Sequence, residues 1–156
     1  MLPPRLVPPI TNIQVNFDGL CQPCNPGGIA CFAFIIKDDK NTIHREYGLA
    51  AHNSTNNVAE YTGIVKALEW LIANNFTNEK IIVRGDSQLV INQVKRKYEV
   101  YAPNIIPLYR KVKSLISKFN NIQTEWIPRE ENKEANKLTW RAYEEIMHQQ
   151  AVYEQP

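Results

Sequence analysis

The spacing of apolar residues changes along the chain from alternation to three- and four-residue steps, and this change separates predicted strands from a predicted helix. Residues 13–19 alternate in polarity and reach an Asp-Gly step, which predicts a strand that ends at Asp18. Residues 29–36 are nearly all apolar, as in a strand covered on both faces. Residues 42–49 form a third predicted strand, and the short connections predict an antiparallel meander.

Beyond the meander, the apolar positions follow a helical repeat. One stripe from Val58 to Ile72 predicts a helix over residues 57–74. The remaining predicted elements are a buried strand over 80–85, helices over 87–97 and 104–119, a strand over 122–128 and a closing helix over 133–149. The predicted order βββαβααβα indicates one α/β domain.

The chain of 156 residues is long enough for one domain with its own core, to which we assign residues 12–148. We expect residues 1–11 to form an extended proline-rich arm and residues 149–156 a C-terminal tail. Hydrophobic residues make up 44% and charged residues 22%, as in ordinary globular chains. The net charge of +2 permits a polyanionic partner without arguing for one.

Location and redox chemistry are constrained by the apolar runs and the cysteines. No apolar run approaches the roughly 20 residues that span a bilayer, and prolines interrupt the N-terminus where a signal peptide would be apolar. We therefore expect no membrane partner and a cytoplasmic location. Cys21 and Cys24 have the spacing of a metal or redox motif, but no second paired motif accompanies them, so a plain loop is favoured.

Three carboxylates are candidates for a shared site. Asp18 and Asp86 each close an apolar strand, and Glu60 falls in the first turn of the first predicted helix. A cap or a solvated face would explain any one of them alone. If all three converge, however, their charges repel, and divalent cations would be needed to neutralise them. Oxygen ligands suit Mg²⁺ or Mn²⁺, and two such ions could clamp the attacking and leaving oxygens of a phosphodiester.

Four motifs occur in a fixed order around these acids: Asp18-Gly19 with residues 25–28, residues 55–60, residues 85–88, and residues 128–135. Together they strongly resemble type 1 ribonuclease H of the archaeal kind, over almost the whole chain. The resemblance implies a mixed sheet, three antiparallel strands followed by two parallel ones, with helices on both faces. It also implies that Asp18, Glu60 and Asp86 hold two Mg²⁺ ions and that the RNA strand of an RNA/DNA hybrid is cut to 5′-phosphate and 3′-hydroxyl ends.

Position 136 departs from the family pattern, which carries a fourth acid there. This chain has Asn136, which has the same shape but no charge. The loss should weaken the cation that activates water and so reduce activity. Such a change suits an engineered substrate trap, which we favour, and also a natural loss of activity.

The resemblance also implies contacts with the hybrid. Short amides can read 2′-hydroxyls in the minor groove, and Thr55 resembles part of a pocket for a DNA-strand phosphate. Turn and cap chemistry is the competing explanation, above all for Asn56. The candidate nucleic-acid contacts are Gly19, Asn25, Thr55, Asn56, Asn57, Ser87, Gln88, Lys95, Arg96, Lys97 and Arg129.

Alternatives to a nuclease remain at this stage. The chain could be a hybrid-binding module without cleavage, or another nuclease or strand-transfer enzyme on the same fold. The loop before the last helix lacks the mobile histidine of many family members and offers Arg129, Glu130 and Glu131 instead. We expect a monomer, with double-stranded RNA as a further possible substrate.

Overall fold

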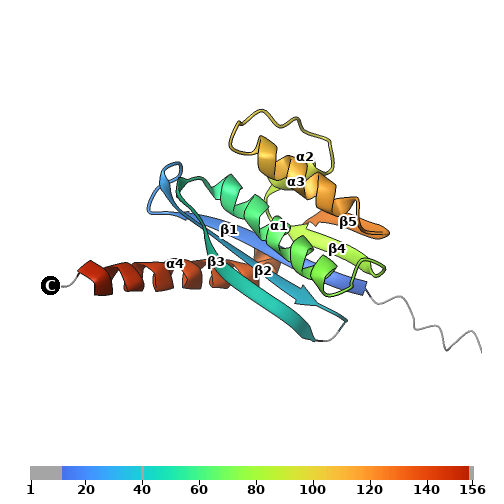
Figure 1. The fold of residues 1–156 in the computed structure, drawn as a ribbon, viewed down its shortest axis with the longest axis horizontal. Helices are drawn as coiled ribbons and strands as arrows, with labels where there is room; N and C mark the ends of the chain where they lie inside the picture. Colours follow the sequence, from blue (N-terminus) through green and yellow to red (C-terminus); the bar gives the residue numbers. More distant parts are fainter. Residues whose placement is uncertain (1–11, 40, 155–156) are drawn as a thin grey trace, which may run out of the picture.

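The structure, a computed structural model, describes residues 12–39 and 41–154. A five-stranded sheet with the strand order β3-β2-β1-β4-β5 organises the chain (Figure 1). The elements follow the predicted order: β1 (Asn12–Gln22), β2 (Gly28–Lys37), β3 (Thr42–Ser54), α1 (Asn56–Ala73), β4 (Lys80–Gly85), α2 (Gln88–Val94), α3 (Ile106–Ile116), β5 (Asn121–Trp126), the 3₁₀ helix η2 (Arg129–Glu131) and α4 (Lys133–Glu154).

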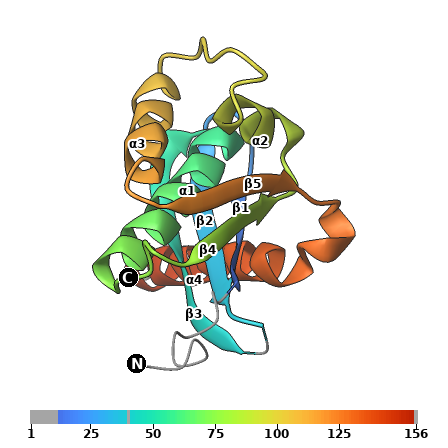
Figure 2. The ribbon, with the colours of Figure 1, turned by 90° about the vertical axis from the view of Figure 1, so that its right-hand side faces the viewer.

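The sheet is mixed, as expected. β1 pairs antiparallel with β2 and parallel with β4, β2 pairs antiparallel with β3, and β4 pairs parallel with β5. Helices α1, α2 and α3 cover one face, and α4 crosses the other (Figures 1 and 2). The side chains of β2 alternate between the two layers: Phe34 joins the large core under α1, whereas Ala33 and Ile35 pack with Leu138 of α4.

The predicted end of the first strand at Asp18 is wrong. β1 continues to Gln22, because β2 keeps pairing with it, with Gly19 opposite Phe32. On its other side the pairing with β4 stops at Asn16. Asp18 therefore lies within a strand, but beyond the end of its parallel neighbour.

Other element ends also differ from the predictions. α2 ends at Val94 rather than at residue 97, because the backbone of Arg96 turns into the left-handed region. β3 runs to Ser54, five residues past its predicted end at residue 49. α4 continues to Glu154, so most of the predicted C-terminal tail is helical.

The expected proline-rich arm, residues 1–11, lies outside the described residues. Within the described part of the chain, none of the helices has the length and apolar character that a bilayer crossing requires.

Candidate active site

Three carboxylates meet beside β1, just beyond the C-terminal end of β4. Asp18 comes from the middle of β1, Glu60 from α1 and Asp86 from the turn after β4. One oxygen of each lies within 4.8 Å of the others. Glu60 lies in the second turn of α1, not in the first as expected, so the helix terminus does not account for an acid there.

The cluster is shielded from solvent. Asp18 and Glu60 are each 3% exposed, and Asp86 is partly buried. Burial, together with the charge of Asp86, raises the pKa of Asp18 to about 6. Burial and the two neighbouring acids raise the pKa of Glu60 well above its usual range.

One oxygen of Glu60 bears on whether cations fit this cluster. Its Oε2 is buried and has no hydrogen-bond partner among the described residues. An unpaired buried carboxylate oxygen costs free energy, and a bound cation would remove that cost. Three oxygen ligands at this separation fit Mg²⁺ or Mn²⁺.

Asn136, in the first turns of α4, belongs to the same site. Its Nδ2 donates a hydrogen bond to Asp18 Oδ2 over 2.9 Å, which opposes the rise in the pKa of Asp18. Rotation of the amide by 180° would instead present Oδ1 toward the cluster. The uncharged side chain thus stabilises the ionised Asp18 in a way that a fourth acid could not.

Asn132 is a positioning residue that the sequence prediction missed. It is 1% exposed, and its Nδ2 donates to the carbonyl oxygen of Phe17 over 2.9 Å and lies 3.5 Å from Asp86 Oδ1. Its Oδ1 accepts from Asn16 over 3.1 Å. Asn132 therefore ties the start of α4 to β1 beside Asp18. An Asn before a helix indicates only a cap in a sequence, so its longer-range role could not be read there.

A hollow of about 390 Å³ surrounds the cluster. It brings together eight of the predicted site residues: Asp18, Gly19, Asn56, Glu60, Asp86, Ser87, Arg129 and Asn136. Leu20, Gln22 and Trp140 line it as well, and none of them was predicted. Trp140 stands one helical turn after Asn136, a spacing that could have pointed to it.

Several polar candidates have structural partners or lie outside the hollow. Thr55 and Ser87 are the N-caps of α1 and α2, accepting hydrogen bonds from Val58 and Val90. Asn25 accepts a hydrogen bond from the backbone N–H of Asn56 over 3.0 Å. The lining of this hollow does not include Asn25, Thr55, Asn57, Gln88, Lys95, Arg96 or Lys97.

Arg129, from the 3₁₀ helix η2, lies beside the acid cluster. The Arg129 Nε lies 3.6 Å from Asp86 Oδ2, although the arginine side chain is 83% exposed.

All three cysteines are free, and the thiol of Cys21 donates to the carbonyl oxygen of Cys24. The expected loop is wrong for Cys21, which belongs to β1, whereas Cys24 lies in the connection between β1 and β2.

The distance between β1 and α1 is set by Gly19. A Cβ at this position would collide with the backbone N of Glu60 and lie 2.8 Å from the Cβ of Ala59. The absence of a side chain lets α1 approach β1 directly after Asp18. This close approach brings Glu60 to the cluster.

A five-stranded sheet in this order, with acids from β1, α1 and the end of β4 meeting at one edge, defines a ribonuclease H-like domain. The sequence profile of the reverse transcriptase-like family matches residues 16–142, and the chain belongs to that family.

Two curated relatives and one solved structure extend this assignment. The bifunctional protein Rv2228c of Mycobacterium tuberculosis is 33% identical over 114 residues, which are 73% of this chain and 31% of that protein. Ribonuclease HI of Halobacterium salinarum is 29% identical over 133 residues, 85% of this chain and 65% of that one. The chain thus spans about a third of the first relative and about two thirds of the second. The crystal structure of LC11-RNase H1 in complex with an RNA/DNA hybrid has a TM-score of 0.79 and 29% identity, covering 86% of this chain and 99% of that one.

Proposed function

We propose that this protein is a metal-dependent endonuclease that hydrolyses the RNA strand of RNA/DNA hybrids, and that Asn136 lowers its activity. The observation that carries the proposal is the convergence of Asp18, Glu60 and Asp86 within 4.8 Å. The similarity to LC11-RNase H1, which was solved with an RNA/DNA hybrid, supports the choice of substrate.

In this proposal, the three acids hold two Mg²⁺ ions, or Mn²⁺ in their place. When bound, such ions lower the pKa of the attacking water and neutralise charge on the leaving 3′ oxygen, giving 5′-phosphate and 3′-hydroxyl ends. The chain's own residues position these ligands. Asn132 fixes the backbone next to Asp18, and Asn136 holds one oxygen of that carboxylate.

The predicted contacts with the hybrid belong to the same proposal. Asn56 lines the hollow beside the acids, and its backbone N–H donates to the side chain of Asn25, which supports the proposal that both contact a strand entering the site. Their amides can donate to and accept from a 2′-hydroxyl. We propose that the protein acts as a monomer and discriminates against DNA duplexes through these contacts.

One observation favours a second candidate, a hybrid-binding module that does not cleave. The Asn136 amide already donates a hydrogen bond to one of the two Asp18 oxygens, and it brings no charge of its own. Loss of one negative ligand weakens cation binding and leaves the attacking water less acidic.

Cleavage of end-labelled duplexes separates the two candidates. RNA/DNA hybrid, double-stranded RNA and double-stranded DNA are incubated in parallel with Mg²⁺ or Mn²⁺, using the present chain and Asn136→Asp. We expect cleavage of the hybrid RNA strand, faster in Asn136→Asp by about tenfold or more. Asp86→Asn in the Asn136→Asp background is the matched control and should abolish it.

The outcomes are distinct. Equal rates for the present chain and Asn136→Asp would disprove the lowered activity. Hybrid binding without cleavage by Asn136→Asp, with either metal, would favour the binding module. Absence of both binding and cleavage would rule out both candidates.

A further inference from the structure

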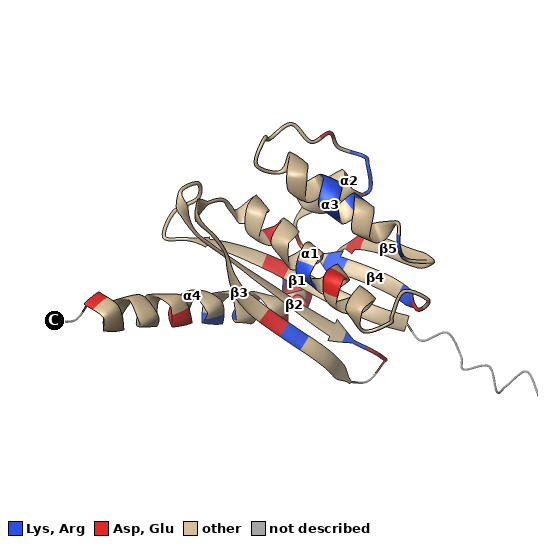
Figure 3. Cartoon of the chain, viewed as in Figure 1, with Lys and Arg blue, Asp and Glu red and all other residues tan. Residues whose placement is uncertain are grey.

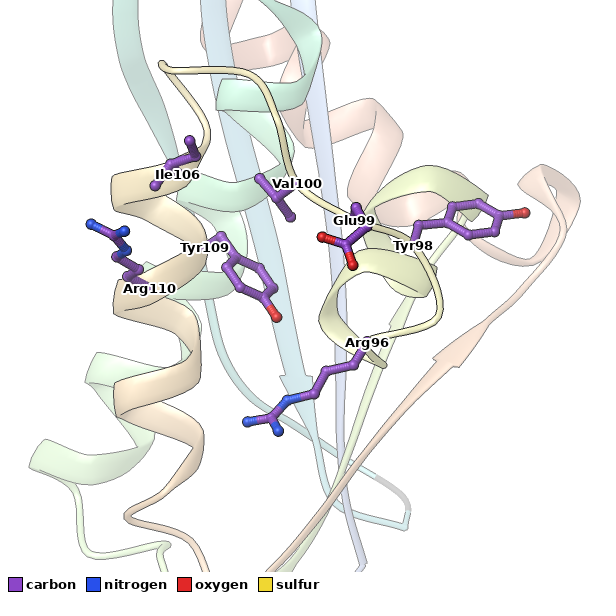
Figure 4. A pocket seen from close by; sticks show the side chains of 7 residues that line it. All are labelled: Arg96, Tyr98, Glu99, Val100, Ile106, Tyr109 and Arg110. Carbon is purple, nitrogen blue, oxygen red and sulfur yellow. The ribbon is translucent and has the colours of Figure 1, made fainter.

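A second hollow, about 470 Å³ in volume, lies between the α2–α3 connection and α3, outside the candidate active site. Its side chains include both cationic and aromatic groups (Figure 4). Arg96 and the ring of Tyr109 extend into the space from opposite sides, and Glu99 points in from the connection. The side chains of Arg110 and Tyr98 start at opposite sides of the space and point away from it.

The two arginines of this hollow have no acidic partner among the described residues. Within the described ranges, neither Arg96 nor Arg110 forms an ion pair, and Glu99 is the one carboxylate of the lining. Lys113 adds a third cation from α3, and burial and the charge of Arg96 lower its pKa. Basic residues gather on α3 and on the connection (Figure 3). Such a site favours an anionic ligand.

The backbone of Arg96 has an unusual conformation for an arginine. Its φ of 64° lies in the left-handed region, directly after the end of α2, and its N–H donates to the carbonyl oxygen of Gln93. Glycine usually occupies this position after a helix, because a Cβ is strained there. The left-handed backbone at this position therefore carries a guanidinium side chain where glycine would be less strained.

The walls of the hollow are fixed by side-chain hydrogen bonds. Gln93 donates to the carbonyl oxygen of Glu99 over 3.4 Å and accepts from the hydroxyl of Tyr61 over 2.7 Å, which ties the connection to α1. Lys113 donates to the carbonyl oxygen of Val94 over 2.8 Å, which ties α3 to α2. The site is therefore built in advance of any ligand.

We propose that this hollow binds a nucleotide of a single-stranded nucleic acid, with its phosphate on Arg96 and its base stacked on Tyr109. A duplex exposes phosphates but hides the faces of its bases, so an aromatic ring beside unpaired cations suits an unpaired strand. The seven residues of α2, about 10 Å long, separate Ser87 of the candidate active site from this region. A strand that leaves a hybrid in the active site could therefore continue into it.

This proposal depends on the proposed function in one respect only: the hybrid from which the single strand extends is the substrate of that function. Binding to a single-stranded oligonucleotide alone, in EDTA and without cleavage, tests it separately. Fluorescence anisotropy is measured with a labelled single strand, a blunt hybrid, and the same hybrid with a single-stranded extension at either end.

Arg96→Gly is the main variant, because glycine suits the left-handed backbone and removes only the side chain. We expect unchanged or higher thermal stability, about fivefold to tenfold weaker binding of the single strand, and a salt slope reduced by about 0.7. Tyr109→Leu should weaken single-strand binding similarly, whereas Tyr109→Phe keeps the ring and should bind normally. Lys111→Ala, on the same helix but paired with Glu69, is the charge-matched control and should change affinity less than about twofold.

Single-strand affinity that is unchanged in both Arg96→Gly and Tyr109→Leu would overturn the proposal. Equal weakening of blunt hybrid and single strand would also overturn it, because the hollow would then be a duplex phosphate contact. If Arg96→Gly does not fold, Tyr109→Leu against Tyr109→Phe decides the question. Loss of hybrid cleavage with intact single-strand binding would count against the proposed function alone.

Discussion

The residue at position 136 affects stability and catalysis in opposite ways, through its contact with the carboxylate of Asp18. Without cations, the hydrogen bond of 2.9 Å between them offsets part of the repulsion among the acids. A carboxylate at position 136 would remove this bond and add charge to a buried cluster. With cations bound, the same carboxylate would become a ligand.

Asn136→Asp should therefore change stability in opposite directions with and without metal. In EDTA at pH 7.5 we expect the free energy of unfolding to fall by about 2 kcal/mol, and Mg²⁺ should raise the melting temperature of this variant more than that of the present chain. Thermal melts with and without Mg²⁺ measure both effects. Asn136→Ala is the control, since it loses the bond without adding charge and should gain little from Mg²⁺. Equal stability of Asn136→Asp and the present chain in EDTA would contradict this account.

Asn132 offers a second prediction for a single side chain. Asn132→Ala should lower the free energy of unfolding by about 2 kcal/mol, because the buried carbonyl of Phe17 and the amide of Asn16 each lose a partner. Urea unfolding measures the change. Asn104→Ala, at an exposed asparagine, should stay within about 0.5 kcal/mol of the present chain. Similar losses in the free energy of unfolding for the two variants would mean that the hydrogen bonds of Asn132 do not stabilise the fold.

The sequence predicted residues whose role follows from local pattern, and it missed residues whose role depends on distant partners. Asp86 follows an apolar strand, so its place at the edge of the sheet was visible in the sequence. Asn132 bonds to a residue 115 positions away, and no local pattern reports that contact. Trp140 looks like one exposed aromatic residue of an amphipathic helix until α4 is placed beside β1.

At the scale of elements, the contact between β1 and α1 makes the cluster depend on the packing of a helix on a strand. Gly19 and Ala59 touch where a larger residue could not fit. A shift of α1 by the width of a methyl group would carry Glu60 away from Asp18. The geometry of the acids is thus coupled to the fold of the sheet and its covering helix.

Gly19→Ala tests this coupling. We expect a loss of about 1–3 kcal/mol in the free energy of unfolding, and weaker Mg²⁺ binding in the folded protein, because the new Cβ displaces α1. Isothermal titration with Mg²⁺ and urea unfolding measure the two effects. Gly48→Ala is the matched control: it adds a Cβ on β3 that would lie 3.4 Å from the ring of Phe32. Normal Mg²⁺ affinity in Gly19→Ala would show that α1 is not positioned by this contact.

The order and type of the elements could be predicted, but several of their ends could not. An Asp-Gly step indicates a turn, yet β2 continues to pair with β1 through Gly19, and this pairing is non-local. The helix after Ser87 stops early because Arg96 adopts a left-handed backbone, which an arginine rarely signals. The closing helix extends past its last buried residues, where the apolar repeat that predicts a helix is lost.

At the scale of the whole molecule, the buried acids make stability depend on pH. Well below pH 3.8 Asp18 is protonated in both the folded and the unfolded state, so its raised pKa does not change the stability there. The pKa of Asp18 is 3.8 in its ordinary state and about 6 in the folded protein. Between these two pH values the unfolded chain has lost the proton while the folded protein still holds it, so unfolding becomes more favourable as the pH rises. Above pH 6 the penalty is constant at about 3 kcal/mol. Glu60 acts in the same direction.

We therefore expect the metal-free protein to lose stability between about pH 4 and 6, and Mg²⁺ to stabilise it more at pH 7.5 than at pH 5. Thermal melts across this range, in EDTA and in Mg²⁺, provide the measurement. Asp18→Asn is the reference, because the difference between its profile and that of the present chain isolates this carboxyl. A difference that does not change with pH would argue against a raised pKa at Asp18.

The central place of β1 in the sheet has a consequence for how the molecule opens. β1 has a strand on each side over residues 14–16, so its backbone amides there cannot be released by fraying of an edge. In hydrogen–deuterium exchange, these amides should be among the last to take up deuterium, together with those of the adjoining β2. The strand that carries Asp18 would then open only when the whole domain unfolds.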